Sequence, residues 1–247
     1  LSERVKGAGF LKTLLLRRMG SSIYAGRRTT EKMLATWGTG ELFAERSGGV
    51  GDEAVGADGD DGNDGEPRNA VVESEMKKLE PLERAELARC LKALEVSQDR
   101  DPKFQKVLDY LIGENWLARG CIIFSQYFDS AWWLAESLSR EHFPTEPIGI
   151  YAGGANSGIL LAGQFKACQR DEIKAKVKHG EIRLLIGTDA ASEGLNLQRL
   201  GTLINLDLPW NPTRLEQRKG RIQRIGQVRD EVFVCNLRYR GSVEDRV

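Results

Sequence analysis

Two neighbouring stretches decide the fold: Leu184–Gln198, which reads LLIGTDAASEGLNLQ, and Ile204–Gln227, which reads INLDLPWNPTRLEQRKGRIQRIGQ. In each, a short apolar run leads into polar residues, as at the carboxyl end of a buried strand. The second stretch continues into a helical pattern that places Arg218, Arg221 and Arg224 on one helix face. Such groups at the ends of parallel strands suit the binding of phosphate, either of a nucleotide or of a nucleic acid.

The same alternation extends over the second half of the chain. Short apolar runs predict strands at Cys121–Phe124, Ile148–Tyr151, Leu184–Thr188, Leu203–Leu206 and Val232–Leu237. Helical patterns lie between several of them, at Ser130–Arg140, Leu160–Val177 and Pro212–Lys219. This order predicts an α/β fold, a parallel sheet with helices on both faces and all strand carboxyl ends along one edge. Asn211 is expected to cap the helix that begins at Pro212.

The first half differs in composition and gives four predicted segments in all. Residues 1–46 read as helices, and residues 47–69 as a flexible acidic loop rich in glycine and aspartate. Residues 70–118 read as a second helical segment, with a helix start at Asp101-Pro102. Residues 119–247 form the α/β lobe, so the helical segments are an amino-terminal extension of it.

Charge is balanced over the chain, with 36 basic and 36 acidic residues, but it is unevenly placed. Acidic residues gather within Asp52–Glu66 and basic ones within Arg214–Arg229. In the acidic stretch, Asp58, Asp60 and Gly62 put glycine where an EF-hand needs its third ligand, so we interpret it as a solvated linker. Four scattered cysteines and two histidines predict no metal site, and we expect reduced, mostly buried thiols. No apolar run approaches membrane-spanning length, so no membrane contact is expected.

Four motifs, in the expected order, resemble those of superfamily 2 helicases of the Swi/Snf type. Ile122–Tyr127 resembles motif IV, Tyr151–Gly154 the glycine turn, Thr188–Leu197 motif V and Gln217–Gln227 motif VI. The Arg-Ile-Gly-Gln ending is typical of the Swi/Snf branch, and the Glu-Gly-Leu-Asn-Leu-Gln and Pro-Trp-Asn-Pro segments are most similar to its bacterial RNA-polymerase-associated and phage-defence members. The resemblance covers about half of the chain. It implies the second, RecA-like motor lobe of a cytoplasmic bacterial or archaeal translocase.

The sequence lacks the parts that hold ATP in this superfamily. No Gly-x-x-x-x-Gly-Lys-Ser/Thr loop occurs, so the β- and γ-phosphates have no cradle. Neither Asp52-Glu53 nor Asp171-Glu172 follows the apolar strand that a metal-binding carboxylate pair needs. We therefore expect ATP and Mg²⁺ to be bound mainly by a first lobe of the same polypeptide, to which residues 1–46 connect. Alone, this chain is expected not to hydrolyse ATP.

The resemblance also assigns residues to the nucleotide. It implies that Arg224 is the arginine finger and that Arg221 is a second phosphate contact. Gly194, Asn196 and Gln217 would lie close to the nucleotide between the lobes. Without the surrounding motif, a pair of arginines on a helix would more readily be a solvated face or a direct contact to nucleic-acid phosphate than a finger.

A second group of residues is assigned by resemblance to nucleic-acid phosphate: Ser125, Gln126, Thr188 and Asp189. Their types also fit a strand-end turn at Ser125 and a helix cap at Thr188. The expected partner is the backbone of double-stranded DNA, bound independently of base sequence. Two alternatives stay open: a non-catalytic RecA-like module that binds an unidentified protein, and a lobe of an RNA helicase.

Overall fold

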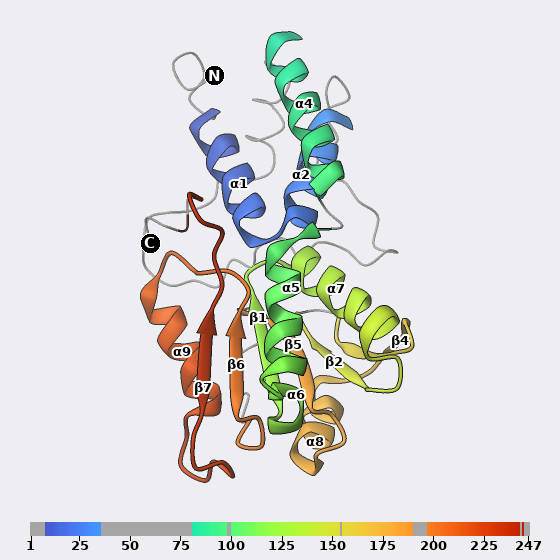
Figure 1. The fold of residues 1–247 in the computed structure, drawn as a ribbon, viewed down its shortest axis with the longest axis vertical. Coiled ribbons are helices and arrows are strands. Elements are labelled where there is room, and N and C mark those ends of the chain that lie inside the picture. Colours follow the sequence, from blue (N-terminus) through green and yellow to red (C-terminus); the bar gives the residue numbers. More distant parts are fainter. Residues whose placement is uncertain are drawn as a thin grey trace. The chain divides into compact units, whose positions relative to one another are not determined.

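The computed structural model describes residues 8–35, 81–97, 100–153, 155–189, 197–242 and 244. The chain divides into two compact units, the first ending at Asp101 and the second beginning at Pro102 (Figure 1). The predicted division into four segments stays a prediction. The acidic stretch within Asp52–Glu66 lies outside the described residues.

The first unit is helical in its described part. It contains α1 (Ala8–Ser21), α2 (Ile23–Ala35) and α4 (Pro81–Ser97). The break between α1 and α2 is set by caps, since the amide of Ile23 donates to the Asp101 carboxylate at 3.1 Å and the amide of Ala25 donates to the Ser22 hydroxyl at 3.0 Å. These bonds satisfy amides that an α-helix leaves unpaired at its start. The predicted helical extension is confirmed in these ranges.

The second unit is built on a seven-stranded sheet of order β4-β3-β2-β5-β1-β6-β7. The strands are β1 (Cys121–Ser125), β2 (Ile148–Tyr151), β3 (Gly158–Leu161), β4 (Gln164–Ala167), β5 (Leu184–Thr188), β6 (Thr202–Asn205) and β7 (Phe233–Asn236). β2, β5, β1, β6 and β7 run parallel, whereas β3 and β4 pair antiparallel. All five predicted strands are confirmed, each to within one residue at either end.

The helix predicted over Leu160–Val177 is wrong in its first half. That part is a β-hairpin, β3 and β4, and only α8 (Arg170–His179) is helical. The turn uses Ala162 and Gly163 with φ of 50° and 73°, the left-handed pair that matches the twist of a two-residue hairpin. Leu160 pairs with β2, so backbone bonding along the sheet edge outweighs the local apolar spacing.

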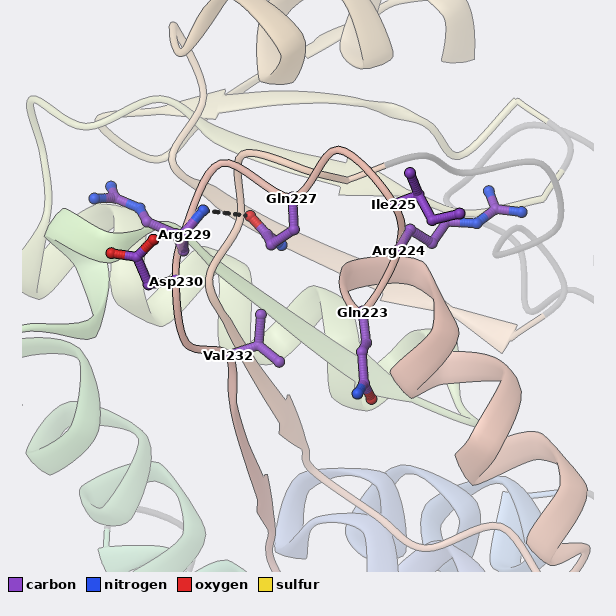
Figure 2. Close-up of a pocket in the computed structure, with 7 residues that line it drawn as sticks. All are labelled: Gln223, Arg224, Ile225, Gln227, Arg229, Asp230 and Val232. Atoms are coloured by element: carbon purple, nitrogen blue, oxygen red, sulfur yellow. Dashed lines mark hydrogen bonds between the residues drawn. The ribbon is translucent and has the colours of Figure 1, made fainter.

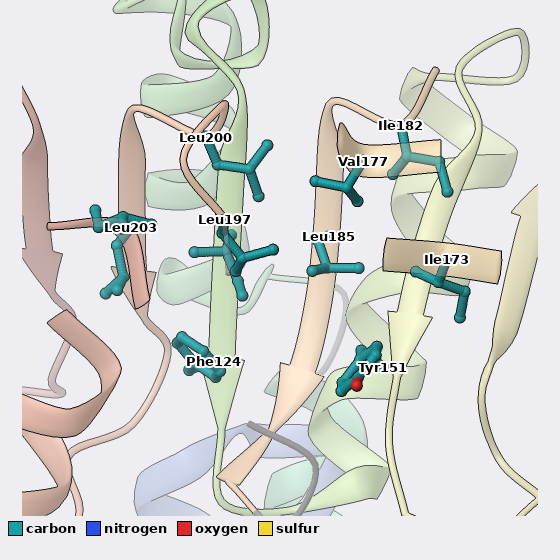
Figure 3. Packing of buried hydrophobic residues seen from close by; sticks show 11 residues of the cluster. Phe124, Tyr151, Ile173, Val177, Ile182, Leu185, Leu197, Leu200 and Leu203 are labelled. Atoms are coloured by element: carbon teal, nitrogen blue, oxygen red, sulfur yellow. The ribbon is translucent and has the colours of Figure 1, made fainter. Parts of the chain in front are cut away.

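Helices cover both faces of the sheet, as predicted. Before and after β1 lie α5 (Pro102–Leu108), the π-helical turn η2 (Asp109–Gly113), α6 (Trp116–Arg119), α7 (Phe128–Ser137) and the π-helical turn η3 (Leu138–His142), and α9 (Pro212–Ile222) follows β6. α7 packs over β1, β2 and β5. α8 contributes Ile173 and Val177 to the buried cluster that includes Phe124 and Leu185 (Figure 3). Ile222 of α9 belongs to the same cluster.

The β3–β4 hairpin leaves no room for a side chain at Gly158. A Cβ added at Gly158 would lie 2.5 Å from the carbonyl oxygen of Lys166, which is backbone and cannot rotate away. We expect Gly158→Ala to lower the free energy of unfolding by about 1–3 kcal/mol. Gly113→Ala is the control, because no atom lies within 4 Å of its added Cβ. Urea unfolding measures both, and equal stability of the two variants would contradict the hairpin geometry.

The four cysteines are free thiols, but only Cys121 is buried, and the other three are half-buried rather than buried as expected. Burial raises the pKa of Cys121 to about 12. At pH 8 its thiol is therefore protonated, and we expect no alkylation by iodoacetamide in the folded protein. Mass spectrometry before and after unfolding checks this. Labelling of native Cys121 as fast as that of Cys168 would contradict it.

Candidate functional site

The carboxyl ends of β1, β5 and β6 meet around one aspartate, Asp207. Ser125 and Thr188 are register neighbours at the ends of β1 and β5. The buried Ser125 hydroxyl donates to the Asp207 carboxylate at 2.6 Å, and the backbone amide of Gln126 donates to it at 2.9 Å. The side-chain amide of Gln126 donates to the carbonyl of Leu208 at 3.1 Å. The structure thus brings together three predicted residues and one, Asp207, that was not predicted.

Arg218 ties α9 to this edge and is almost fully buried, at 1% exposure. Its Nε and Nη2 donate to the Asp189 carboxylate at 2.5 and 2.7 Å. Its Nη1 donates to Asn205 Oδ1 and to the Asp207 carbonyl, both at 3.0 Å, and Nη2 lies 3.5 Å from the Asp207 carboxylate. Burial acts to lower the pKa of Arg218, but Asp189 and then Asp207 outweigh it, so the pKa is raised. A permanent charge therefore joins β5, β6 and α9.

The three arginines do not share one helix face, which corrects the sequence prediction. α9 begins as expected, with the Asn211 side chain accepting from the amide of Thr213 at 2.9 Å. However, it ends at Ile222, so Arg224 lies beyond the helix. Arg218 is held inside by two carboxylates, and Arg221 is half-buried on the helix. Acidic partners distant in sequence drew Arg218 inward, which helical spacing alone does not indicate.

Two glutamines, Gln198 and Gln227, hold the loop that carries Arg224; Figure 2 shows this loop with Gln227. Gln198 donates from its side chain to the carbonyl of Ile225 at 2.5 Å. Gln227 donates to two backbone carbonyls, one at the end of α9 at 2.7 Å and one in the segment before β6 at 3.2 Å. Gly226 has a φ of 88°, and a Cβ there would lie 2.6 Å from the Gln198 amide. The Arg-Ile-Gly-Gln segment is thus a turn whose conformation is fixed by these side-chain hydrogen bonds.

The loop from Gln223 to Val232 borders an open hollow of about 400 Å³. In Figure 2 the side chain of Arg224 points away from Asp230, and it is exposed. Arg229 lines the same hollow and donates to the carbonyl of Ala118 at 3.1 Å. Among the residues that the structure describes, neither Arg221 nor Arg224 forms an ion pair. Unlike Arg218, these two guanidinium groups therefore pair with no carboxylate among the described residues.

The two parts of the candidate site lie at opposite ends of β6. α9 starts after the carboxyl end of β6, and its last turn returns to the segment before that strand, where the amide of Leu197 donates to the Arg221 carbonyl at 3.2 Å. Its 11 residues span roughly 16 Å. One helix thus connects the Asp207 edge with the Arg224 loop.

The remaining predicted residues are placed as follows. Thr188 is buried, and its hydroxyl has no hydrogen-bond partner among the described residues. Asp189 accepts two bonds from Arg218, and Gln217 is exposed on α9. Gly194 and Asn196 lie outside the described residues. The binding roles assigned to all of these residues stay predictions.

Sequence reasoning missed Asp207, Gln198 and a buried ion pair. Asp207 directly follows a run predicted as a strand, so the rule that selected Thr188 would also have found it. Lys103 donates to the carbonyl of Leu206 at 2.6 Å and to Glu244 at 3.0 Å, which braces the carboxyl end of β6. Burial raises the pKa of Glu244, and Lys103 partly offsets this. No local pattern indicates a pair so far apart in sequence.

The described ranges contain no group of three or more His, Cys, Asp or Glu side chains arranged to hold a metal ion. None of their helices has the length and apolar character needed to cross a membrane.

The second unit is similar to domains of known proteins. Residues 102–226 match the family described as the helicase conserved C-terminal domain. The uncharacterized ATP-dependent helicase YqhH of Bacillus subtilis is 46% identical over 91 residues, 37% of this chain and 16% of that protein. RNA polymerase-associated protein RapA of Vibrio atlanticus is 32% identical over 129 residues, 41% of this chain and 13% of that protein. The chain thus matches less than a fifth of the length of these relatives.

The fold is similar to that of a solved structure. The crystal structure of the C-terminal part of the Fun30 ATPase domain superposes with a TM-score of 0.52 at 18% identity, covering 99% of this chain and 72% of that one. This likeness concerns the fold: a RecA-like sheet with helices on both faces and amino-terminal helices.

Proposed function

The chain belongs to the family of helicase conserved C-terminal domains, in the Swi/Snf-type branch of superfamily 2, and from this we propose that it is the second motor lobe of an ATP-dependent nucleic-acid translocase. The whole protein would hydrolyse ATP and move along double-stranded DNA in the cytoplasm. In this proposal the lobe supplies the motor with an arginine finger and with contacts to the phosphate backbone of the nucleic acid.

The observation that carries the proposal is the contrast among the three arginines of α9 and its loop. Arg218 is occupied by Asp189 and Asp207, whereas Arg221 and Arg224 have no carboxylate in the described part of the chain. Arg224 is exposed on a loop that two glutamines hold in shape. A rigid, permanently charged fork of this kind suits the charge that develops on the γ-phosphate oxygens during phosphoryl transfer.

ATP and Mg²⁺ would be held mainly by a first lobe of the same polypeptide. ATP would supply the phosphoryl group, and Arg224 and Arg221 would stabilise its developing charge when the lobes close. Gln217, exposed one turn before Arg221, would complete this side of the nucleotide site together with Gly194 and Asn196, which lie outside the described residues. The chain alone would be inactive, because its sequence has no phosphate-binding loop.

Nucleic-acid phosphate would bind at the carboxyl edge, close to Thr188 and Gln126. A buried hydroxyl without a partner costs about 1–3 kcal/mol, and a phosphate oxygen would satisfy the hydroxyl of Thr188. Ser125 already donates its proton to Asp207, so its part is to shape the turn that presents the neighbouring groups. Asp189 likewise acts through Arg218, by fixing the end of β5 against α9. Contacts to phosphate would be independent of base sequence and weakened by salt.

Thr188→Val tests the nucleic-acid part of the proposal. We expect stability to be unchanged or slightly higher, because the hydroxyl makes no internal bond in the described part. Affinity for a labelled duplex of mixed sequence should fall by about tenfold or more, the loss of one hydrogen bond to a charged group. Fluorescence anisotropy with the 247-residue chain measures it.

Thr202→Val is the matched control. Thr202 is also a buried strand threonine, but its hydroxyl donates to the carbonyl of Gly120 at 3.0 Å. The Thr202→Val variant should lose about 1 kcal/mol of its free energy of unfolding and keep its affinity for DNA. If Thr188→Val binds DNA as tightly as the unmodified chain, the phosphate contact at this edge is contradicted.

A further inference from the structure

The helical hairpin formed by α1 and α2 carries positive charge for which the proposed motor function has no use. Between Ala8 and Ala35 the chain has one acidic residue, Glu31, and six basic residues: Lys12, Arg17, Arg18, Arg27, Arg28 and Lys32. The whole chain is balanced, and α4 of the same unit has three basic and three acidic residues. The α1–α2 hairpin therefore carries a local excess of positive charge that the composition of the whole chain does not explain.

The packing of the hairpin brings together the backbone segments that carry its two arginine pairs. A Cβ added at Gly26 of α2 would lie 2.6 Å from Met19 Cγ and 3.1 Å from Met19 Cα of α1. Two helices in ordinary contact have axes roughly 8–10 Å apart, and contact at a glycine allows them to come closer. Arg17 and Arg18 directly precede Met19, and Arg27 and Arg28 directly follow Gly26. In sequence, the two arginine pairs therefore flank this close contact between the helices.

Acidic groups of the hairpin neutralise only part of this charge. Glu31 lies 3.0 Å from Arg27 and 3.9 Å from Arg28, so one carboxylate serves two guanidinium groups. The side chains of Arg27 and Arg28 are 25% and 42% exposed, which leaves both open to a partner. Their Nε atoms are buried without a hydrogen-bond acceptor within the described ranges. Arg17 and Arg18 each have an interaction of their own, so the charge argued from here is that of Arg27 and Arg28.

We propose that the α1–α2 hairpin is a second binding surface for nucleic-acid phosphate, in the first unit and additional to the carboxyl edge of the sheet. Guanidinium groups bind phosphate oxygens through two parallel N–H bonds, and paired arginines on two close helices suit adjacent phosphates of one backbone. Such contacts fix position and add affinity without reading base sequence. The choice of duplex DNA as partner rests on the proposed function, but the test below needs neither ATP nor a first lobe.

The test compares two double variants of the 247-residue chain. Arg27→Gln with Arg28→Gln removes two charges from the hairpin, and Arg89→Gln with Lys92→Gln removes two from α4, where Arg89 already pairs with Glu86 at 2.6 Å. We expect the hairpin variant to bind duplex DNA about tenfold more weakly at low salt, with the slope of log Kd against log salt shallower by about 2. The α4 variant should stay within about twofold.

A charge-retaining variant, Arg27→Lys with Arg28→Lys, guards against misfolding. It should keep the salt slope of the unmodified chain, and thermal melting should give a similar midpoint for all variants. An unchanged slope in the glutamine variant, or an equal loss in the α4 variant, overturns the proposal. So does a glutamine variant that keeps DNA affinity but loses binding to polyglutamate, because the surface would then serve an acidic protein.

The outcome also separates this inference from the proposed function. If Thr188→Val weakens DNA binding and the hairpin variant does not, the hairpin surface is refuted and the carboxyl edge stands. The reverse result supports the hairpin and refutes the edge. No binding of duplex DNA by the unmodified chain overturns both.

Discussion

Replacing Arg224 with alanine, in a protein that carries both motor lobes, is expected to lower ATP turnover by about 10³- to 10⁵-fold. The guanidinium would no longer meet the charge that develops on the transferred phosphoryl group. Nucleotide affinity should change little, because the phosphate cradle would belong to the first lobe. DNA affinity should also persist, because the carboxyl edge and the Arg224 loop lie at opposite ends of β6. Phosphate release and nucleotide titration measure the two quantities separately.

Arg229→Ala is the control for this prediction. Arg229 is exposed and lines the same hollow, but its guanidinium donates to the carbonyl of Ala118. Its loss removes the same charge from the same loop and should leave turnover near that of the unmodified protein. Arg224→Lys should rescue only part of the activity, since an ammonium is a point charge and not a planar fork. Normal turnover in Arg224→Ala, or an equal loss in Arg229→Ala, would exclude the finger assignment.

Arg218→Ala is expected to destabilise the second unit strongly. It would leave the Asp189 and Asp207 carboxylates without their buried cation, and breaking a buried pair in this way costs about 3–5 kcal/mol. Asn205 would lose a donor at the same time. Urea unfolding, followed by circular dichroism, gives the change in free energy.

Two further variants decide what causes that loss. Lys219→Ala changes the next residue, whose exposed side chain lies 3.6 Å from Glu216, and should alter stability by no more than about 0.5 kcal/mol. Adding Asp189→Asn to Arg218→Ala removes one uncompensated charge, so the double variant should be more stable than Arg218→Ala alone. If Arg218→Ala is as stable as Lys219→Ala, the buried ion pairs contribute nothing and this account of the edge is wrong.

Local signals in the sequence were enough for the parallel part of the sheet. The strands from Cys121, Ile148 and Leu184 follow from short apolar runs, because each is buried on both faces. The start of α9 follows from Asn211 and Pro212, whose chemistry fixes a helix start without help from distant residues. These elements obey rules that act over a few positions, and a sequence displays such rules directly.

The wrong predictions concern residues whose structure depends on partners distant in the sequence. The hairpin at Gly158–Ala167 forms because β2 offers an edge to pair with, and its Leu160 and Leu161 also fit a helix. Helical spacing alone does not distinguish Arg218 from Arg221 and Arg224. In the folded chain, however, Arg218 forms an ion pair with Asp189, which lies 29 positions away in the sequence. Only the folded chain distinguishes a structural arginine from one that is open to a ligand.

The most direct test of the motor assignment is steady-state ATP hydrolysis by a protein that carries both lobes, with duplex DNA, single-stranded DNA, RNA or no polymer added, and with the 247-residue chain alone as reference. The proposal predicts strong stimulation by duplex DNA and no hydrolysis by the chain alone. Greater stimulation by RNA would indicate the RNA helicase alternative. Absence of hydrolysis under every condition would contradict the motor assignment and favour a protein-binding module.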